Sequence, residues 1–302
     1  MRILLDCDPG HDDAFALLLA LASPELELAG VTTVSGNQTV EKTTANALRL
    51  LELVGRDVPV ARGADRPLVR ARSVAAYVHG ETGLDGPDLP PPATEPVAAH
   101  AVDFLAEHVA GTTLVATGPL TNVALLHALH PEARPERLVL MGGAIGEGNT
   151  TPAAEFNIWA DPEAAARVFA SGWEITMVGL DVTHRALIAP EQRERLRAAG
   201  RVGTVAAELL DFYGRFHAQN YPEFGGGSPM HDPVCVAHLL DDSLLELRRA
   251  FVEVDCGWAQ GRGRTNVHLR RRTEREPNVD VAVGIDGPRF AELLVERVGS
   301  LG

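Results

Sequence analysis

The feature that most constrains the fold is the alternation of short aliphatic runs with stretches of helical periodicity through the first two thirds of the chain. Strands are predicted at residues 2–6, 27–34, 58–63, 112–118, 137–143 and 174–182. Helices are predicted between them at residues 12–22, 43–55, 96–110, 121–130 and 161–172. Such an order predicts an α/β fold with an open, mostly parallel central sheet and helices on both faces.

The last third of the chain departs from this order. Residues 190–219 are predicted to be helical and exposed, and a closing helix is predicted at residues 288–298. Further strands are predicted at residues 251–258, 264–270 and 279–286. We therefore expect a single domain, residues 1–302, in which a Rossmann-like sheet is joined by additional C-terminal strands and helices.

Two segments rich in glycine and proline, residues 79–92 and 220–229, interrupt the helical and strand patterns. Both are predicted to be mobile loops. Loops of this length in a compact domain are either lids over a site or plain surface connections, and the sequence leaves both interpretations open.

The charge balance limits the class of ligand. The chain has 27 basic and 41 acidic residues and a formal net charge of -14, which repels nucleic acids and anionic membranes and favours a small neutral substrate. No apolar run approaches the ~20 residues that span a bilayer, so no membrane association is expected. The three cysteines lack the spacing of a metal site and are expected to be reduced, as in a cytoplasmic protein.

The most unusual local sequence is DCDPGHDD at residues 6–13, directly after the first predicted strand. Repulsion among its four carboxylates costs free energy unless a cation lies between them, which indicates a metal ion. The adjacent Asp12 and Asp13 are expected to point apart, so that one could bind the metal and the other a substrate. The alternative for either residue is that it only caps the helix.

Polar residues also follow other predicted strands, at the edge of the sheet where ligands bind in α/β proteins. Asn37 follows the second strand, and TGPLTN, MGGAIGEGN and DVTH follow later ones. Asp232 in MHDPV is a further candidate metal ligand. A loop supplies Asn149, Glu155 and Asn157, whose amides and carboxylate suit sugar hydroxyls, although a solvated loop is the alternative. Oxygen ligands of this kind favour Ca²⁺, with Mg²⁺ as the second choice.

Six motifs, taken in order, resemble the inosine-uridine-preferring nucleoside hydrolase family over nearly the whole chain. They are DCDPGHDDA, TTVSGN, TGPLTN, LMGG, AEFN and HDP. The resemblance implies a Ca²⁺-dependent enzyme that hydrolyses the N-glycosidic bond of ribonucleosides to ribose and a free base. By analogy with the family we also expect a homodimer or homotetramer and a role in purine or pyrimidine salvage.

The same resemblance implies roles for individual residues. The implied metal ligands are Asp8, Asp13, the backbone carbonyl of Thr117, and Asp232. The implied ribose contacts are Asp12 and Asn37 for the 2′- and 3′-hydroxyls, and Asn149, Glu155 and Asn157 for the rest of the sugar. All of these positions match the family pattern without substitution.

The expected chemistry follows from these assignments. Asp8 is the expected general base toward a water held by the metal, because calcium acidifies water less than zinc does. The negative charge of residues 6–13 would stabilise an oxocarbenium-like transition state. By resemblance, His231 is the candidate general acid for the leaving base, with plain packing near the metal as the alternative. His79 is either a base contact or a lid residue without a chemical role, and His11 is interpreted as structural.

The preferred base is left open between purine and pyrimidine. Some purine-accepting members of the family carry a tyrosine in the segment where this chain offers His217 and Tyr221 as substitutes. Phe156, Trp159 and Trp258 are able to stack on a base but are interpreted first as core residues.

Two other functions fit parts of the pattern. A Mg²⁺-dependent phosphohydrolase of the haloacid dehalogenase type also begins with Asp-x-Asp after its first strand, but Gly10 stands here where that family has a hydroxylated residue. A non-catalytic Ca²⁺-dependent nucleoside- or sugar-binding protein would keep the ligands without the base, and the presence of Asp8 disfavours it.

Overall fold

A computed structural model of the chain describes residues 1–270 and 274–302. Its main feature is a nine-stranded sheet in the order β10-β9-β11-β6-β5-β4-β1-β2-β3. The strands are β1 (Arg2–Cys7), β2 (Glu27–Thr33), β3 (Val60–Arg62), β4 (Thr113–Ala116), β5 (Arg137–Met141), β6 (Ile175–Val178), β9 (Leu245–Val254), β10 (Thr265–His268) and β11 (Val279–Ile285). The strands from β11 to β3 run parallel, and β9 pairs antiparallel with both β10 and β11.

The position of β1 explains where a ligand site can form. The chain runs outward from β1 in one direction through β2 and β3, and in the other through β4, β5 and β6. The order of the strands thus reverses between β1 and β4. Open α/β sheets bind ligands beyond the carboxyl ends of the strands at such a reversal. The acidic loop that follows β1 lies at this place.

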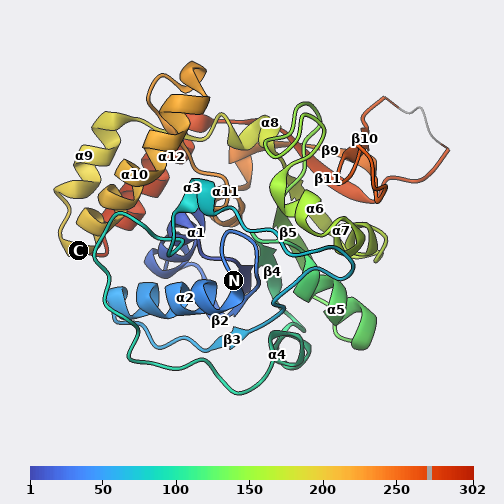
Figure 1. Cartoon of the computed structure of the whole chain (residues 1–302), viewed down its shortest axis with the longest axis horizontal. Helices are drawn as coiled ribbons and strands as arrows, with labels where there is room; N and C mark the ends of the chain where they lie inside the picture. The colour runs from blue at the N-terminus through green and yellow to red at the C-terminus, as the bar shows by residue number, and fades with distance from the viewer. Residues whose placement is uncertain (271–273) are drawn as a thin grey trace.

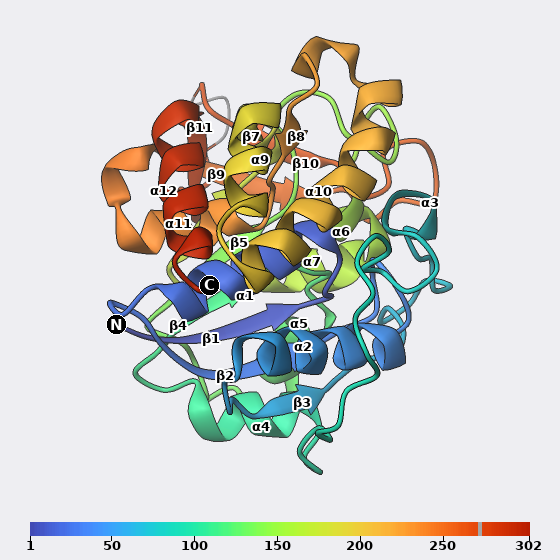
Figure 2. The ribbon, with the colours of Figure 1, turned by 90° about the vertical axis from the view of Figure 1, so that its left-hand side faces the viewer.

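Helices cover both faces of the sheet (Figure 1). The apolar core of one face includes α1 (His11–Ala22), α2 (Val40–Val54), α9 (Pro190–Arg197), α10 (Arg201–Asn220), α11 (Pro233–Leu240) and α12 (Gly287–Gly299). The core of the other face includes α4 (Ala101–His108), α5 (Thr121–Leu129) and α7 (Pro162–Phe169). Figure 2 shows α10, α11 and α12 stacked over α1 on one side of β1, with α4 on the other side. Helix α1 is apolar nearly all round because it packs between the sheet and this outer layer.

Short elements complete the carboxyl edge of the sheet. They are α3 (Ala76–His79), α6 (Phe156–Ala160), α8 (Leu180–Thr183), the 3₁₀ turns Pro222–Phe224 and Asp242–Leu244, and the small antiparallel pair β7 (Leu187–Ile188) and β8 (Ser228–Pro229). Several of the residues discussed below lie on these short elements, which the sequence periodicity does not reveal.

The predicted fold class is confirmed, and the differences from prediction have physical causes. Residues 190–219 form two helices, and α10 is not exposed as predicted, because Val202, Leu209 and Tyr213 on one of its faces are buried. The predicted strand 174–182 ends at Val178, where α8 follows after one residue. Strand β9 begins at Leu245, earlier than predicted, because its first half carries exposed polar residues that hide the alternation.

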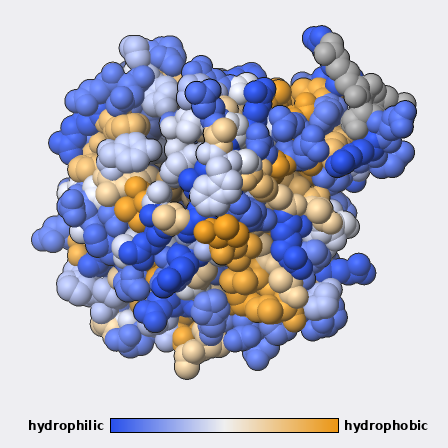
Figure 3. All heavy atoms as spheres, turned by 45° about the vertical axis from the view of Figure 1, so that its right-hand side comes forward, coloured by the Kyte–Doolittle hydropathy of each residue, from blue (hydrophilic) through white to orange (hydrophobic). Residues whose placement is uncertain are grey.

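The surface and the thiols agree with the composition. Within residues 1–270 and 274–302, no helix has the length and hydropathy that crossing a bilayer requires. Hydrophilic residues dominate the face in Figure 3, and apolar residues gather in a band across its centre and lower part. All three cysteines are free, and two of them, Cys7 and Cys235, are buried.

Candidate active site

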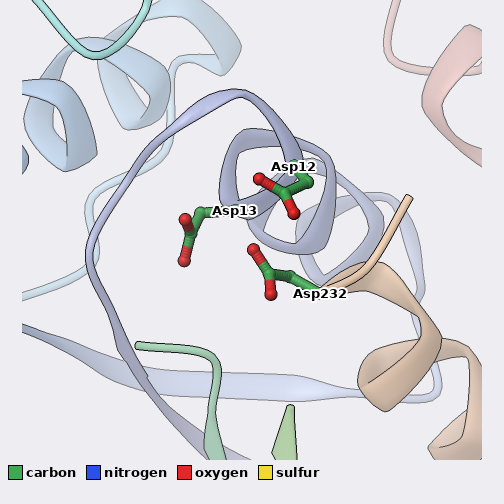
Figure 4. Close-up of side chains that lie close together, drawn as sticks. All are labelled: Asp12, Asp13 and Asp232. Carbon is green, nitrogen blue, oxygen red and sulfur yellow. The ribbon is translucent and has the colours of Figure 1, made fainter. Parts of the chain in front are cut away.

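Three aspartates from two distant parts of the chain meet at the carboxyl edge of the sheet. Asp12 and Asp13 lie in the first turn of α1, and Asp232 directly precedes the first residue of α11. Each offers a carboxylate oxygen, and these oxygens lie within 4.8 Å of one another. Figure 4 shows the three carboxylates gathered around a common space.

Asp12 and Asp13 therefore do not point apart as the sequence suggested. In an α-helix every Cα–Cβ bond tilts toward the N-terminus, so neighbouring side chains in the first turn can both lean over the helix start. Asp232 approaches the same space from the opposite side. Adjacency in the sequence thus does not separate these two carboxylates in space.

Asp13 is held rigidly by hydrogen bonds to both of its carboxylate oxygens. Its Oδ1 accepts from the Thr117 hydroxyl at 2.8 Å and from the Asp8 backbone amide at 3.3 Å. Its Oδ2 accepts from the Asn37 side-chain amide at 2.9 Å and from the Gly10 amide at 3.1 Å. The segments that follow β1, β2 and β4 therefore converge on the Asp13 carboxylate. Asn37 both bonds to this carboxylate and lines the cavity.

Asp8 lies just beneath this group and is only half satisfied. Its Oδ2 accepts from the Asn37 backbone amide at 2.6 Å. Its Oδ1 and the Oδ1 of Asp12 are buried and have no hydrogen-bond partner among the described residues. A buried carboxylate oxygen without a partner is costly, so both atoms indicate that a ligand belongs there.

The electrostatics of the group favour a cation. Burial first, and then the charge of Asp13, raise the pKa of Asp8 well above its usual range. Burial and then Asp13 raise the pKa of Asp12 to about 8, and burial followed by Asp12 raises that of Asp232. No lysine or arginine is among the described residues that line the cavity above the group. These oxygens, together with the nearby carbonyl of Thr117, fit a hard divalent cation such as Ca²⁺.

A second polar set surrounds the start of α6. Glu155 caps this helix: its Oε1 accepts from the Asn157 amide at 2.7 Å, and its Oε2 accepts from the Gly143 and Ile158 amides at 2.9 and 3.1 Å. Burial raises the pKa of Glu155 to about 7 despite these donors. Asn149 fixes the same turn, because its Oδ1 accepts from the Phe156 amide at 2.9 Å.

Asn157 links the two polar sets. Its side-chain amide donates to the Thr117 carbonyl at 2.6 Å and to the Met141 carbonyl at 3.2 Å. This bond ties α6 to the ends of β4 and β5, beside the acidic group.

One cavity joins these features. The residues predicted to contact substrate all line it: Asp12, Asn37, His79, Asn149, Glu155 and Asn157. Thr117, His231 and Asp232 line it too, whereas Asp8 and Asp13 lie behind this lining with no exposed surface. The structure thus brings the predicted residues into one place.

The outer wall of the cavity was largely missed by sequence reasoning. Tyr77, Tyr213 and Phe216 line it without having been singled out, as does His184. The sequence contained hints of two of these residues. Tyr213 lies four residues before His217 on α10, so the two share a helix face. His184 belongs to the polar DVTH sequence after β6.

The two tryptophans proposed as core or stacking residues lie outside this lining. Trp258 is 79% exposed, so its interpretation as a core residue is wrong. The guanidinium of Arg70 lies 3.8 Å from the centre of its ring, and Arg262 lies 4.1 Å from that of Trp159. Phe156 is buried and does line the cavity.

Comparison with known proteins gives a consistent result. Residues 3–292 match the family described as "Inosine-uridine preferring nucleoside hydrolase". The chain is 52% identical over 305 residues to the pyrimidine-specific ribonucleoside hydrolase RihA of Shewanella sp. (strain ANA-3), covering 98% of this chain and 95% of that protein. It is 50% identical to RihA of Klebsiella pneumoniae, covering 99% and 98%. Among solved structures, the purine-preferring ribonucleoside hydrolase from Gardnerella vaginalis superposes with a TM-score of 0.94 at 34% identity, covering 100% of this chain and 99% of that one.

Proposed function

The chain belongs to the inosine-uridine preferring nucleoside hydrolase family, and from that premise we propose that it hydrolyses pyrimidine ribonucleosides with the help of a bound Ca²⁺. Its relatives show that it is a ribonucleoside hydrolase, which acts on N-glycosidic bonds.

The observation that carries the proposal is the pairing of two polar sets in one cavity. Asp12, Asp13 and Asp232 bring their oxygens together, and the unpartnered Oδ1 atoms of Asp8 and Asp12 are buried beside them. The α6 residues Glu155 and Asn157 lie across the same cavity. This arrangement suits a ligand that has a diol near a cation and a third hydroxyl farther away, as a ribose does.

Different residues of the chain bind the metal, remove the proton from water and orient the sugar. Ca²⁺ would be held by Asp8, Asp13, Asp232 and the Thr117 carbonyl, and when bound it would supply the positive charge that orients and acidifies a water. We assign to Asp8 the removal of the proton from the attacking water, since its Oδ1 is buried beside the acidic group and has no partner among the described residues. Asp12 and Asn37 orient the 2′- and 3′-hydroxyls of the sugar.

The other polar residues serve the sugar and the leaving base. Asn149, Glu155 and Asn157 bind the remaining part of the ribose, and the surrounding carboxylates stabilise the oxocarbenium-like transition state. His231 is the proposed general acid: it lines the cavity, and its Nδ1 lies 2.7 Å from the Thr183 hydroxyl, which can either donate or accept.

The pyrimidine preference is supported by the relatives. The proteins at 50 and 52% identity are named pyrimidine-specific, whereas the purine-preferring structure is 34% identical. The outer wall of this cavity includes Tyr213, Phe216 and His217 of α10, which are able to contact a base.

One assay tests the proposal and its alternatives. The purified protein is incubated with uridine, cytidine, inosine and 4-nitrophenyl phosphate, with added Ca²⁺ or with a chelator, and released ribose and phosphate are measured. We expect ribose release from uridine and cytidine that the chelator abolishes and Ca²⁺ restores. Faster release from inosine would overturn the base preference, and chelator-resistant release would overturn the role of the metal.

We also propose that the chain forms one domain, that it is located in the cytoplasm, and that it assembles as a homodimer or homotetramer. The apolar band in Figure 3 and the exposed side chains of Leu68, Val69 and Trp258 support association of copies. Light scattering of the purified chain measures its mass in solution. A monomer at micromolar concentration would contradict the oligomer.

A further inference from the structure

We propose that His79 is a neutral imidazole fixed in the Nε2–H tautomer, which donates a hydrogen bond to an acceptor atom on the departing base and delivers no proton to it. This inference rests on the proposed function, because it concerns the base side of the same cavity. It is carried by the contacts of three groups around His79: the start of α1, the His11 ring and the loop after α3.

The start of α1 determines which nitrogen of His79 is bare. The helix begins at His11, and Gly10 before it has no side chain with which to cap the free amides. The His11 backbone amide donates instead to His79 Nδ1, at 3.2 Å. An amide nitrogen can only donate, so His79 Nδ1 must carry a lone pair and no proton. The positive end of the helix dipole acts in the same direction.

The tight fit of the ring shows that this contact is built into the fold. A Cβ added at Gly10 would lie 2.6 Å from His79 Nδ1, so only glycine lets the imidazole come this close to the helix start. The His79 ring stacks against those of His11 and Tyr213, with centroids 5.4 and 5.7 Å away. The ring is therefore fixed both in its plane and across its faces.

His11 cannot supply a proton to His79. Its Nε2 lies 2.8 Å from the Asp85 backbone carbonyl, which can only accept, so the single proton of a neutral His11 is on Nε2. The His11 Nδ1, 3.2 Å from His79 Nδ1, is then bare as well.

The bare His11 Nδ1 could in principle accept from a proton on His79 Nδ1. In that tautomer, the proton on His79 Nδ1 would clash with the hydrogen of the His11 backbone amide, which already points at the same nitrogen. The amide cannot reverse its role, so the Nε2–H tautomer is favoured. His11 is thus a positioning residue that acts through His79, and its own link to the Asp85 carbonyl ties the loop to α1.

The free nitrogen of His79 faces the substrate. His79 lines the cavity, and its Nε2 makes no hydrogen bond to another described residue while not being a buried unpartnered atom. Burial, followed by the nearby His11 and His217, lowers the pKa of His79 well below its usual range. A neutral histidine at a helix start that polarises a carbonyl is a known catalytic device in triosephosphate isomerase.

The contrast with His231 separates two roles. The Thr183 hydroxyl beside His231 Nδ1 can donate or accept, so this contact does not fix the tautomer of His231. The amide beside His79 Nδ1 does not allow this. We therefore assign hydrogen-bond donation to His79. It requires a substrate base with a carbonyl oxygen or ring nitrogen near the glycosidic bond.

The tautomer is measured directly by NMR. Protein labelled with ¹⁵N-histidine gives long-range ¹H–¹⁵N correlations that distinguish a bare nitrogen from a protonated one. The His79 signals are identified by their loss in His79→Gln. We expect a bare Nδ1 and a protonated Nε2 that do not change across the neutral pH range. A protonated Nδ1, or a doubly protonated ring at neutral pH, would overturn the inference.

Kinetics provide the second test. A glutamine amide reaches the Nε2 position and donates without a transferable proton, whereas phenylalanine fills the space without donating. His79→Gln should keep uridine turnover within about 10-fold of wild type, and His79→Phe should lose about 100-fold, the usual cost of one such donor. Equal losses in both variants would contradict donation by a neutral group.

A control keeps this failure separate from that of the proposed function. If the wild-type protein releases no ribose from any nucleoside, the proposed function itself is contradicted. If the wild-type protein is active on uridine and His79→Gln is as impaired as His79→Phe, only the role assigned to His79 is contradicted. Thermal melting of both variants shows whether either loss reflects unfolding.

Discussion

At Asp8, the two carboxylate oxygens have different environments, and this asymmetry supports the role proposed for the residue. Oδ2 is held by the Asn37 amide, while Oδ1 has no partner among the described residues. Nearby Asp6 is equally buried and also leaves one oxygen, its Oδ2, without a partner among the described residues, while its Oδ1 accepts from two side chains at 2.5 and 2.8 Å. Asp8 is the one of the two that bonds directly to the group of three aspartates, because its backbone amide donates to Asp13 Oδ1 at 3.3 Å.

The first prediction compares these two aspartates. Asp8→Ala, or the isosteric Asp8→Asn, should reduce uridine turnover by several orders of magnitude, because both the base and a metal ligand are lost. Asp6→Asn is the matched control and should lower thermal stability more than turnover. Steady-state kinetics with saturating Ca²⁺ measure the effect. Near-normal turnover in Asp8→Asn would remove this residue from the mechanism.

The second prediction concerns the titration of Glu155. Its pKa is raised by burial from 4.5 to about 7, so the folded state binds the proton more tightly than the unfolded state. The stability this provides is fully present below the unfolded pKa and is lost as pH rises through about 7. The Tm of metal-free wild type should therefore fall more between pH 5 and 8 than that of Glu155→Gln. Parallel Tm curves for the two proteins would contradict the raised pKa.

At the scale of elements, the sequence allowed us to predict those strands and helices whose hydrophobic pattern is local and regular. Strands β1 to β6 were predictable because parallel strands buried on both faces appear as aliphatic runs. Strand β9 was predicted too short because its first half, with Arg248 and Arg249, is exposed. Helix α6 has five residues, too few to show a period, although its capping residue Glu155 was recognised by its chemistry. The site residues that directly follow the strands could be predicted because the strands themselves were predicted.

The third prediction concerns the turn between β4 and α5. A Cβ at Gly118 would lie 2.6 Å from Asp8 Oδ1, the unpartnered oxygen. Gly118→Ala should therefore displace Asp8 and weaken Ca²⁺ binding and turnover at least about 10-fold, while the fold persists. Gly299→Ala is the control, because its Cβ would meet only Ala199 at 3.4 Å, far from the cavity in the fold. Calorimetric titration with Ca²⁺ measures the difference, and equal affinities would show that the space at Gly118 is not needed.

At the scale of the whole molecule, the sequence could not show how distant segments close on one another. Asp232 was recognised as a candidate metal ligand from its own sequence, and the family resemblance joined it to Asp8 and Asp13, but the local pattern of neither segment shows that they meet in space. The stacking of His11 on His79 and Tyr213 depends on α10 lying over α1. The sequence showed none of these contacts of His11, because its partners are 68 or more residues away in the chain.

The acidic group also links the stability of the whole molecule to pH and metal. Burial raises the pKa values of Asp8, Asp12 and Asp232, that of Asp12 to about 8, from an ordinary value of 3.8. Each raised pKa contributes stability that is present below the unfolded value and is lost as pH rises through the folded one. Metal-free protein should therefore become less stable as pH rises from about 4 to about 8.

The fourth prediction follows from the opposite requirement of a cation, which binds the deprotonated carboxylates and so releases protons. Added Ca²⁺ should raise the Tm of chelator-treated protein, and the increase should be larger at pH 8 than at pH 5. Asp232→Asn should reduce this increase, whereas Asp280→Asn, which removes a surface carboxylate paired with Arg249, should not. Differential scanning calorimetry measures all three proteins at both pH values. A Ca²⁺-induced increase that is absent, or that is larger at pH 5, would show that these carboxylates do not hold the ion, because protons and calcium would then not compete for the same oxygens.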